Sequence, residues 1–191
     1  MNVPQSALTL AQANELTTAQ QLELGQRQSL QFEQIAQGIQ ALPGVKSVGA
    51  IDDLPLGSQI RQASRFVIEG RPIPAAEVRP VLQFRTVSLG YFSSLGIPLL
   101  RGRLFTPDDL KLQNVTVINE TMERRFWPKG DYLGKRINLC SLFPTPCWSS
   151  VIGVVGNVHQ FGLDAEPTLY AGHVQQLGGA NPLPNLMEVK G

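Results

Sequence analysis

The sequence predicts an α+β fold in which short strands outnumber short helices around a buried core. Hydrophobic residues make up 42% of the 191 residues and charged residues only 16%, a balance typical of globular and not of disordered chains. Strand patterns also alternate with capped helical turns, most densely over Val87–Trp127. The net charge of +1 comes without any basic run, so electrostatic binding to nucleic acid or anionic lipid is not expected.

The N-terminal part of the chain predicts a strand–helix–strand unit. Ala7–Leu10 has the pattern of a short strand, and residues 20–41 are rich in glutamine with few helix breakers. Apolar positions in this region fit one face of a helix; these are Leu24, Phe32, Ile35, Ala36, Ile39 and Leu42. Pro43-Gly44 ends the helix and Val45–Ile51 follows as a strand, which is compatible with a right-handed crossover.

Two loops and two strands are expected next. Residues 52–62 (DDLPLGSQIRQ) and Glu69–Glu77 have loop composition, with glycine and proline as breakers. Between and after them, Ser64–Ile68 and Val81–Val87 have strand patterns.

The dense stretch that follows predicts a capped helix and then a strand. Ser88 is a plausible N-cap for a helix over Leu89–Leu95, and Gly96 occupies the position after the helix where a positive φ is needed. Ile97–Phe105 then predicts a strand in which Arg101 and Arg103 alternate with leucines. Gly102 lies within this strand.

A helical turn, a strand and a second helix complete the stretch. Thr106–Asp109 predicts a helical turn, with proline at its first position and acidic residues near its positive end. Val115–Ile118 predicts a buried strand, and Asn119 predicts the N-cap of a helix over Glu120–Phe126. Met122 and Phe126 lie on one face of that helix, whereas Glu120, Glu123, Arg124 and Arg125 are expected to form surface charge pairs.

The C-terminal part predicts further strands at Gly134–Leu139, Trp148–Val158, Leu169-Tyr170 and Leu186–Val189. Gly153 and Gly156 in IGVVGN do not follow the dinucleotide-binding order, so close approach of another backbone explains them better. Trp127 and Trp148 are expected to anchor the core.

Several ordered segments resemble one family. YFSSLGIPLLRGRLFTPDD, VTVINETMERRFWP with the following LGKRI, and VIGVVGNVHQFGLDAEPTLY resemble the MacB-type periplasmic core domain of FtsX-like permeases in type VII ABC transporters. The resemblance runs from about Leu8 to the C-terminus. It implies a porter-like strand–helix–strand subdomain with an inserted small mixed α/β (Sabre-like) subdomain.

Mapped onto this chain, the resemblance implies four regions. Residues 1–68 would form the first half of the porter-like subdomain, 69–79 a linker, 80–172 the insert, and 173–191 a linker followed by the start of the second half. The helix and last strand of that second half would be missing, so an apolar helix face and a sheet edge would be uncovered. Self-association or poor order of this region is the expected consequence.

Cys140 and Cys147 lie in NLCSLFPTPCWSS, where two prolines favour a bent loop. In the extracytoplasmic setting that the resemblance implies, a disulfide between them is the preferred interpretation, and two free thiols are the alternative.

No catalytic or cofactor pattern is evident in the sequence. It contains no phosphate-binding G-x-x-x-x-G-K-[ST] loop and no G-x-S-x-G elbow. The two histidines, His159 and His173, lack the spacing of metal ligands. The acidic pairs Asp52-Asp53 and Asp108-Asp109 are explained by capping and solvation. We therefore predict no catalytic residue, no cofactor and no metal.

The resemblance implies a non-catalytic extracytoplasmic domain of an ABC transporter permease subunit at the periplasmic face of the bacterial inner membrane. Its partners would be the transmembrane part and ATP-binding cassette of that transporter, a periplasmic adaptor or lipoprotein, and a second copy in a dimer. Its role would be to transmit ATP-driven movement in efflux, export or signalling, and a stand-alone periplasmic binding or adaptor module is the alternative. The family motif residues are expected to be structural: Tyr91, Phe92, Gly96, Arg101, Gly102, Asn119, Phe126 and Gly134.

Overall fold

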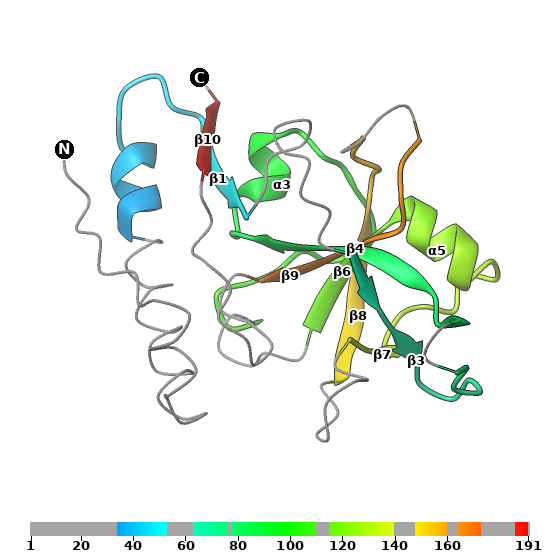
Figure 1. Cartoon of the computed structure of the whole chain (residues 1–191). Coiled ribbons are helices and arrows are strands. Elements are labelled where there is room, and N and C mark those ends of the chain that lie inside the picture. The colour runs from blue at the N-terminus through cyan, green and yellow to red at the C-terminus, as the bar shows by residue number, and fades with distance from the viewer. Residues whose placement is uncertain are drawn as a thin grey trace, which may run out of the picture.

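One mixed sheet runs through the molecule and carries short helices on its faces (Figure 1). The computed structural model describes residues 34–52, 63–75, 78–109, 115–139, 148–159, 164–172 and 186–190. The strand order is β10-β1-β4-β9-β6-β8-β7-β3, with β2 paired to β4 and β5 paired to β8. The strands are β1 Ser47–Ile51, β2 Ala63–Arg65, β3 Val67–Ile68, β4 Val81–Val87, β5 Leu99–Gly102, β6 Val115–Asn119, β7 Arg136–Asn138, β8 Trp148–Val155, β9 Thr168–Gly172 and β10 Leu186–Lys190.

The helices whose bounds lie within the described residues are α3 (Tyr91–Ser94), α5 (Glu120–Phe126) and a helix across residues 34–40. Two strand pairs, β4 with β9 and β6 with β8, are parallel, and the remaining pairs are antiparallel. The predicted α+β class is therefore confirmed. Residues 34–40 belong to the helix expected from the glutamine-rich stretch, and Gly44 ends the following turn at φ 86°. The strand predicted at Ala7–Leu10 lies outside the described residues.

The strand expected over Ser64–Ile68 is divided in two, and that prediction was wrong. β2 pairs with β4, whereas β3 pairs with β7 on another part of the sheet. The chain changes partner at Phe66, which is fully buried and whose backbone N–H donates to the carbonyl of Pro80 at 3.1 Å. The Phe66 ring packs edge-on against Phe126, with centroids 5.0 Å apart. Burial of this ring between the two strands accounts for the break.

The core has two layers, one on each face of the sheet, because neighbouring strand residues point to opposite faces. Ile118 and Leu169 face one layer, and Val117 and Tyr170 face the other. The first layer packs under α5 and includes Phe66, Leu82, Met122, Trp127, Tyr132 and Ile137. The second packs under α3 and includes Ile51, Val87, Tyr91, Phe92, Phe105 and Val155. Trp127 is thus a core anchor as predicted, whereas Trp148 is only half-buried.

Glycines allow β5 to lie against β8. A Cβ at Gly153 would lie 2.2 Å from the carbonyl oxygen of Arg103, so no other residue fits there without movement of the backbone. Gly102 faces it with φ 73°, and a Cβ there would lie 2.3 Å from the carbonyl oxygen of Ile152. The prediction of close backbone approach at Gly153 is confirmed. Strand β5 is shorter than expected since it ends at Gly102.

Candidate functional site

β1 contacts the segment Thr86–Ser94, which includes the end of β4 and all of α3. We call this contact the β1 junction. The backbone N–H of Asp52 donates to the carbonyl of Thr86 at 3.0 Å, and that of Ser88 donates to the carbonyl of Ala50 at 2.9 Å. Ile51 pairs with Val87 between them. β1 also pairs along its whole length with β10 on its other side. The junction is therefore where the β1–β10 end of the sheet joins the rest of the molecule.

Ser88 does not cap the helix, and that prediction was wrong. Its Oγ instead accepts a hydrogen bond from the backbone N–H of Ala50 at 2.8 Å. The helix begins later than expected, at Tyr91, and its N-cap is Gly90, which has no side chain to bond with. The serine is used for the junction because β1 approaches it and its N–H needs a partner in a buried place.

Backbone lies directly on backbone where α3 meets β1. A Cβ at Gly90 would lie 1.9 Å from the carbonyl oxygen of Val48, and a Cβ at Gly49 would lie 2.6 Å from Cα of Tyr91. On its other side α3 inserts Tyr91 and Phe92, both 1% exposed, into the core. β1 therefore cannot shift relative to β4 without also displacing α3 and its aromatic anchors.

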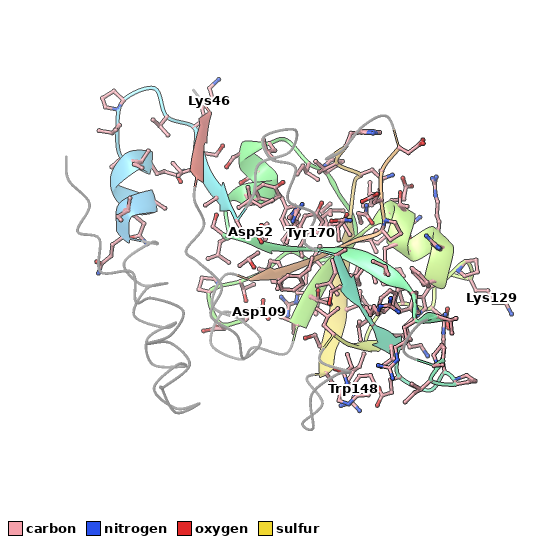
Figure 2. The ribbon with its side chains drawn as sticks, in the orientation of Figure 1. Lys46, Asp52, Asp109, Lys129, Trp148 and Tyr170 are labelled. Carbon is pink, nitrogen blue, oxygen red and sulfur yellow. The ribbon has the colours of Figure 1, made fainter. Side chains whose placement is uncertain are left out.

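Figure 2 shows the side chains of this region, with Asp52 and Tyr170 labelled near the middle of the sheet. The ring of Phe92 packs edge-on against Tyr170 with centroids 5.1 Å apart, and Tyr91 lies 6.2 Å from the same ring. Burial raises the pKa of the Tyr170 hydroxyl, so this tyrosine is neutral and serves the packing. Aromatic contacts thus extend the junction from β1 through α3 to β9.

The family motif residues lie at turns, in the core and at contacts between elements. Three of the glycines, Gly96, Gly102 and Gly134, have φ of 65°, 73° and 74°, a conformation that favours glycine. Tyr91 and Phe92 belong to the junction, and Phe126 packs on Phe66 as described above.

Asn119 joins three elements. Its Oδ1 accepts from the backbone N–H of Met122 at 3.0 Å, which caps α5 as predicted, and from the backbone N–H of Thr168 at 3.0 Å. Its Nδ2 donates to the carbonyl of Glu166 at 2.8 Å. The side chain is 0% exposed, so these bonds tie β6, α5 and the start of β9 together away from water.

Two arginines of the segment that follows α3 hold buried carboxylates. Arg101 donates to Glu123 of α5 at 2.6 Å, and Glu123 is only 5% exposed. The expectation that Glu123 would be part of a surface pair was therefore wrong, because its carboxylate is buried and pairs with Arg101 of β5. The pair between Arg124 and Glu120 does form at the surface, at 2.6 Å.

Asp109 is the second buried carboxylate. Arg103 donates to both of its oxygens, at 2.5 and 2.9 Å, and Thr106 donates to it through its backbone N–H and its hydroxyl. The Arg103 guanidinium and these Thr106 donors lower the pKa of Asp109 to about 2. The predicted helical turn at Thr106–Asp109 is thus held by its acidic residue reaching back to the turn's start.

The described residues contain no group of three or more His, Cys, Asp and Glu that could hold a metal ion. His159 is exposed, and His173, Cys140 and Cys147 lie outside the described residues, so the disulfide stays a prediction. In the part of the chain that the structure describes, no helix is both long enough and apolar enough to cross a bilayer.

The sequence interpretation missed Gly49 and Gly90. A signal was available, because Gly90 fell inside the predicted helix, where glycine costs about 1 kcal/mol relative to alanine. That cost indicates a later helix start or a close contact, and the structure has both.

Comparison with known proteins gives one family and a set of related folds. The family model of the MacB-like periplasmic core domain matches residues 3–176. Comparison with curated protein sequences finds no match. The periplasmic region of MacB from Actinobacillus actinomycetemcomitans superposes with a TM-score of 0.56 and 19% identity, covering 83% of this chain and 63% of that one.

A domain described as that of a permease from Porphyromonas gingivalis superposes with a TM-score of 0.53 and 16% identity, covering 82% of this chain and 66% of that one. The extracellular domain of the transporter YknZ from Gram-positive bacteria matches with a TM-score of 0.47 and 18% identity, covering 74% and 62% of the two chains. This chain therefore spans less than two thirds of the length of these structures, and it shares the mixed α/β fold of the first two.

Proposed function

We propose that this chain, which belongs to the MacB-like periplasmic core domain family, is the extracytoplasmic domain of an ABC transporter permease subunit and transmits movement. The observation that carries the proposal is the family match over residues 3–176. In such a permease the membrane helices would flank the domain. The domain would be non-catalytic, and ATP hydrolysis would take place in another domain or subunit.

The β1 junction supports a mechanical role. Movement of flanking segments would reach the sheet through β1 and β10, which pair residue by residue from Ser47 to Ile51. At the junction, the contacts of Gly49 and Gly90 leave no space for sliding. Interiors packed this closely transmit displacement instead of absorbing it. A shift of β1 would therefore move α3, β4 and the two core layers as one body.

The partners follow from the same proposal. The chain would work beside its own transmembrane part and an ATP-binding cassette, as one half of a dimer, and would engage a periplasmic adaptor or lipoprotein in efflux, export or signalling. We also propose the division into a porter-like unit around β1 and β10 and an inserted unit over residues 80–172.

Cell fractionation of the complete gene product in its bacterial host tests the proposal. We expect the protein in the membrane fraction, and we expect Lys129→Cys, in an exposed turn, to react with a membrane-impermeant maleimide in spheroplasts. The parent protein, labelled in the same way, shows how much of the maleimide reacts with the native Cys140 and Cys147. Recovery in the soluble periplasmic fraction would instead establish a stand-alone binding module, and labelling only after lysis would place the domain in the cytoplasm.

A further inference from the structure

Positive charge is gathered at the end of the sheet opposite β1 and β10. Residues 63–81 and 124–138 contain eight Lys and Arg but three Asp and Glu, whereas the rest of the chain contains eight and twelve. The net charge of +1 is therefore the sum of +5 on these two segments and −4 on the rest of the chain. The expectation that the chain does not bind nucleic acid or anionic lipid electrostatically rested on the net charge and on the absence of a basic run, and neither describes this local excess.

The two segments are side by side in space. β3 pairs with β7, Arg136 forms a two-bond ion pair with Glu69, and Arg71 donates to the carbonyl of Phe126. We call the surface formed by residues 63–75, 78–81 and 124–138 the arginine end. Figure 2 shows Lys129 and Trp148 at this side of the molecule and Lys46 at the other.

Three exposed cations of the arginine end, Arg71, Arg125 and Lys129, form no ion pair within the described residues. The neighbouring Arg124, Lys135 and Arg136 already face carboxylates. Within the described residues, these three cations therefore contribute positive charge that no ion pair neutralises.

Two of these cations are held on aromatic rings. The Arg71 guanidinium lies 5.6 Å from the ring centroid of Trp127, and that of Arg125 lies 5.5 Å from that of Phe126. A guanidinium held on a ring keeps N–H groups available for a carboxylate and loses less side-chain entropy on binding. The adjacent rings Phe126 and Trp127 thus present two oriented arginines.

Apolar side chains accompany these charges. Half of the large hydrophobic side chains that are exposed in the described residues belong to the arginine end; they are Ile73, Val78, Val81 and Leu133. Arginine and exposed apolar groups in one patch are the composition of a protein-binding surface, with the apolar groups as anchors and the cations at the rim.

We propose that the arginine end docks an acidic segment of a partner protein, whose carboxylates are received by Arg71, Arg125 and Lys129. The choice of a protein over an anionic membrane rests on the proposed function. The membrane parts would be attached through the β1–β10 end, and Figure 1 shows β7 and β3 on the side of the molecule away from β1 and β10. The arginine end would therefore point away from the inner membrane and toward a periplasmic partner.

A matched pair of charge reversals tests the docking. Lys129 and Lys46 are both exposed, neither makes an ion pair within the described residues, and they lie at opposite ends. Lys129→Glu and Lys46→Glu change the net charge equally, so only the location differs. The probe is a fluorescein-labelled deca-glutamate peptide, measured by fluorescence anisotropy at several salt concentrations.

We expect the parent chain to bind the peptide with an affinity that falls as salt rises. Lys129→Glu should weaken binding about three- to tenfold, as the reversal of one charge at a rim does, while Lys46→Glu should change it less than about twofold. Arg71→Gln with Arg125→Gln should weaken it further, and circular dichroism checks that this double variant is folded. Equal losses in the two lysine variants, or no binding by the parent chain, would overturn the proposal.

Two further measurements exclude the other occupants. Binding to phosphatidylglycerol vesicles that is stronger than binding to the peptide, and that Lys129→Glu abolishes, would assign the surface to a membrane. Self-association in sedimentation velocity that Lys129→Glu abolishes would assign it to a second copy of the chain. Cell fractionation tests the permease assignment independently of the docking surface, because it does not use Lys129→Glu. The two proposals can therefore fail separately.

Discussion

Replacing Asn119 by alanine should be among the most destabilising single changes in the chain. The substitution removes the cap of α5, which is worth about 1 kcal/mol. It also leaves the buried backbone N–H of Thr168 without its acceptor, at a cost of about 1–3 kcal/mol, whereas the carbonyl of Glu166 loses Asn119 but still accepts from the Thr168 hydroxyl. The expected loss is about 2–4 kcal/mol, against a total of about 5–15 kcal/mol for a domain of this kind.

Asn157 offers a matched control for this prediction. Its Oδ1 also accepts a hydrogen bond from a backbone N–H in the first turn of α5, that of Thr121 at 3.0 Å, but Asn157 is exposed. Water can replace the side chain there, so Asn157→Ala should cost less than about 1 kcal/mol. Asn119→Asp should fall between the two alanine variants, because it keeps both accepted bonds and loses the donor to Glu166.

Urea unfolding followed by tryptophan fluorescence measures these differences, since buried Trp127 packs in the core layer under α5. The slope of the unfolding free energy with urea should be the same in all variants, so that the midpoints report stability. If the unfolding free energies of Asn119→Ala and Asn157→Ala differ by less than about 0.5 kcal/mol, burial does not determine how much these hydrogen bonds contribute to stability, and the reasoning is refuted.

Three other predictions concern packing, pH and the cysteines. Gly90→Ala should destabilise the chain by about 2 kcal/mol or more through its contact with Val48, whereas Gly38→Ala in the exposed helix, where nothing lies within 4 Å, should be neutral or slightly stabilising; thermal unfolding compares them, and equal effects would contradict a close contact. The lowered pKa of Asp109 contributes stability that is present above pH 3.8 and is lost as the pH falls toward about 2. Asp109→Asn should therefore lower stability at pH 7 by about 2 kcal/mol and flatten its pH dependence in that window, and a parallel curve for the two proteins would contradict the assignment. A disulfide between Cys140 and Cys147 should leave no thiol that reacts with Ellman's reagent in the unfolded, unreduced chain, and its reduction should cost about 2–3 kcal/mol; two reactive thiols would establish the free form.

Elements whose signals are local could be predicted from the sequence. Val81–Val87 has its predicted bounds, and α5 begins after Asn119 and ends at Phe126 as expected. In both cases the deciding information lies within one turn or one strand, where alternation and capping act directly on the backbone. The family resemblance was likewise carried by short, ordered segments, and the family match confirms it.

Features that depend on a distant partner could not be predicted in the same way. Ser88 has the chemistry of a helix cap, but Ala50, 38 residues earlier, competes for its hydroxyl. Glu123 has the spacing of a surface pair, but Arg101 on β5 covers it. In each case the residue type was interpreted correctly and the wrong neighbour was assigned, because a sequence pattern contains only neighbours within a few residues.

The arginine end shows why this limit matters most for function. Its charges belong to two segments separated by more than forty residues of chain; residues 124–138 contain five Lys and Arg against one acidic residue, and residues 63–81 contain three against two. Only the pairing of β3 with β7, which depends on the turn of the chain at Phe66, makes one continuous patch of them. The close packing at the β1 junction arises similarly, from two glycines that come together only because α3 packs against β1. A domain that couples movement at one end to docking at the other would need both features, and both depend on the sheet's long-range pairing, which brings distant segments of the chain together.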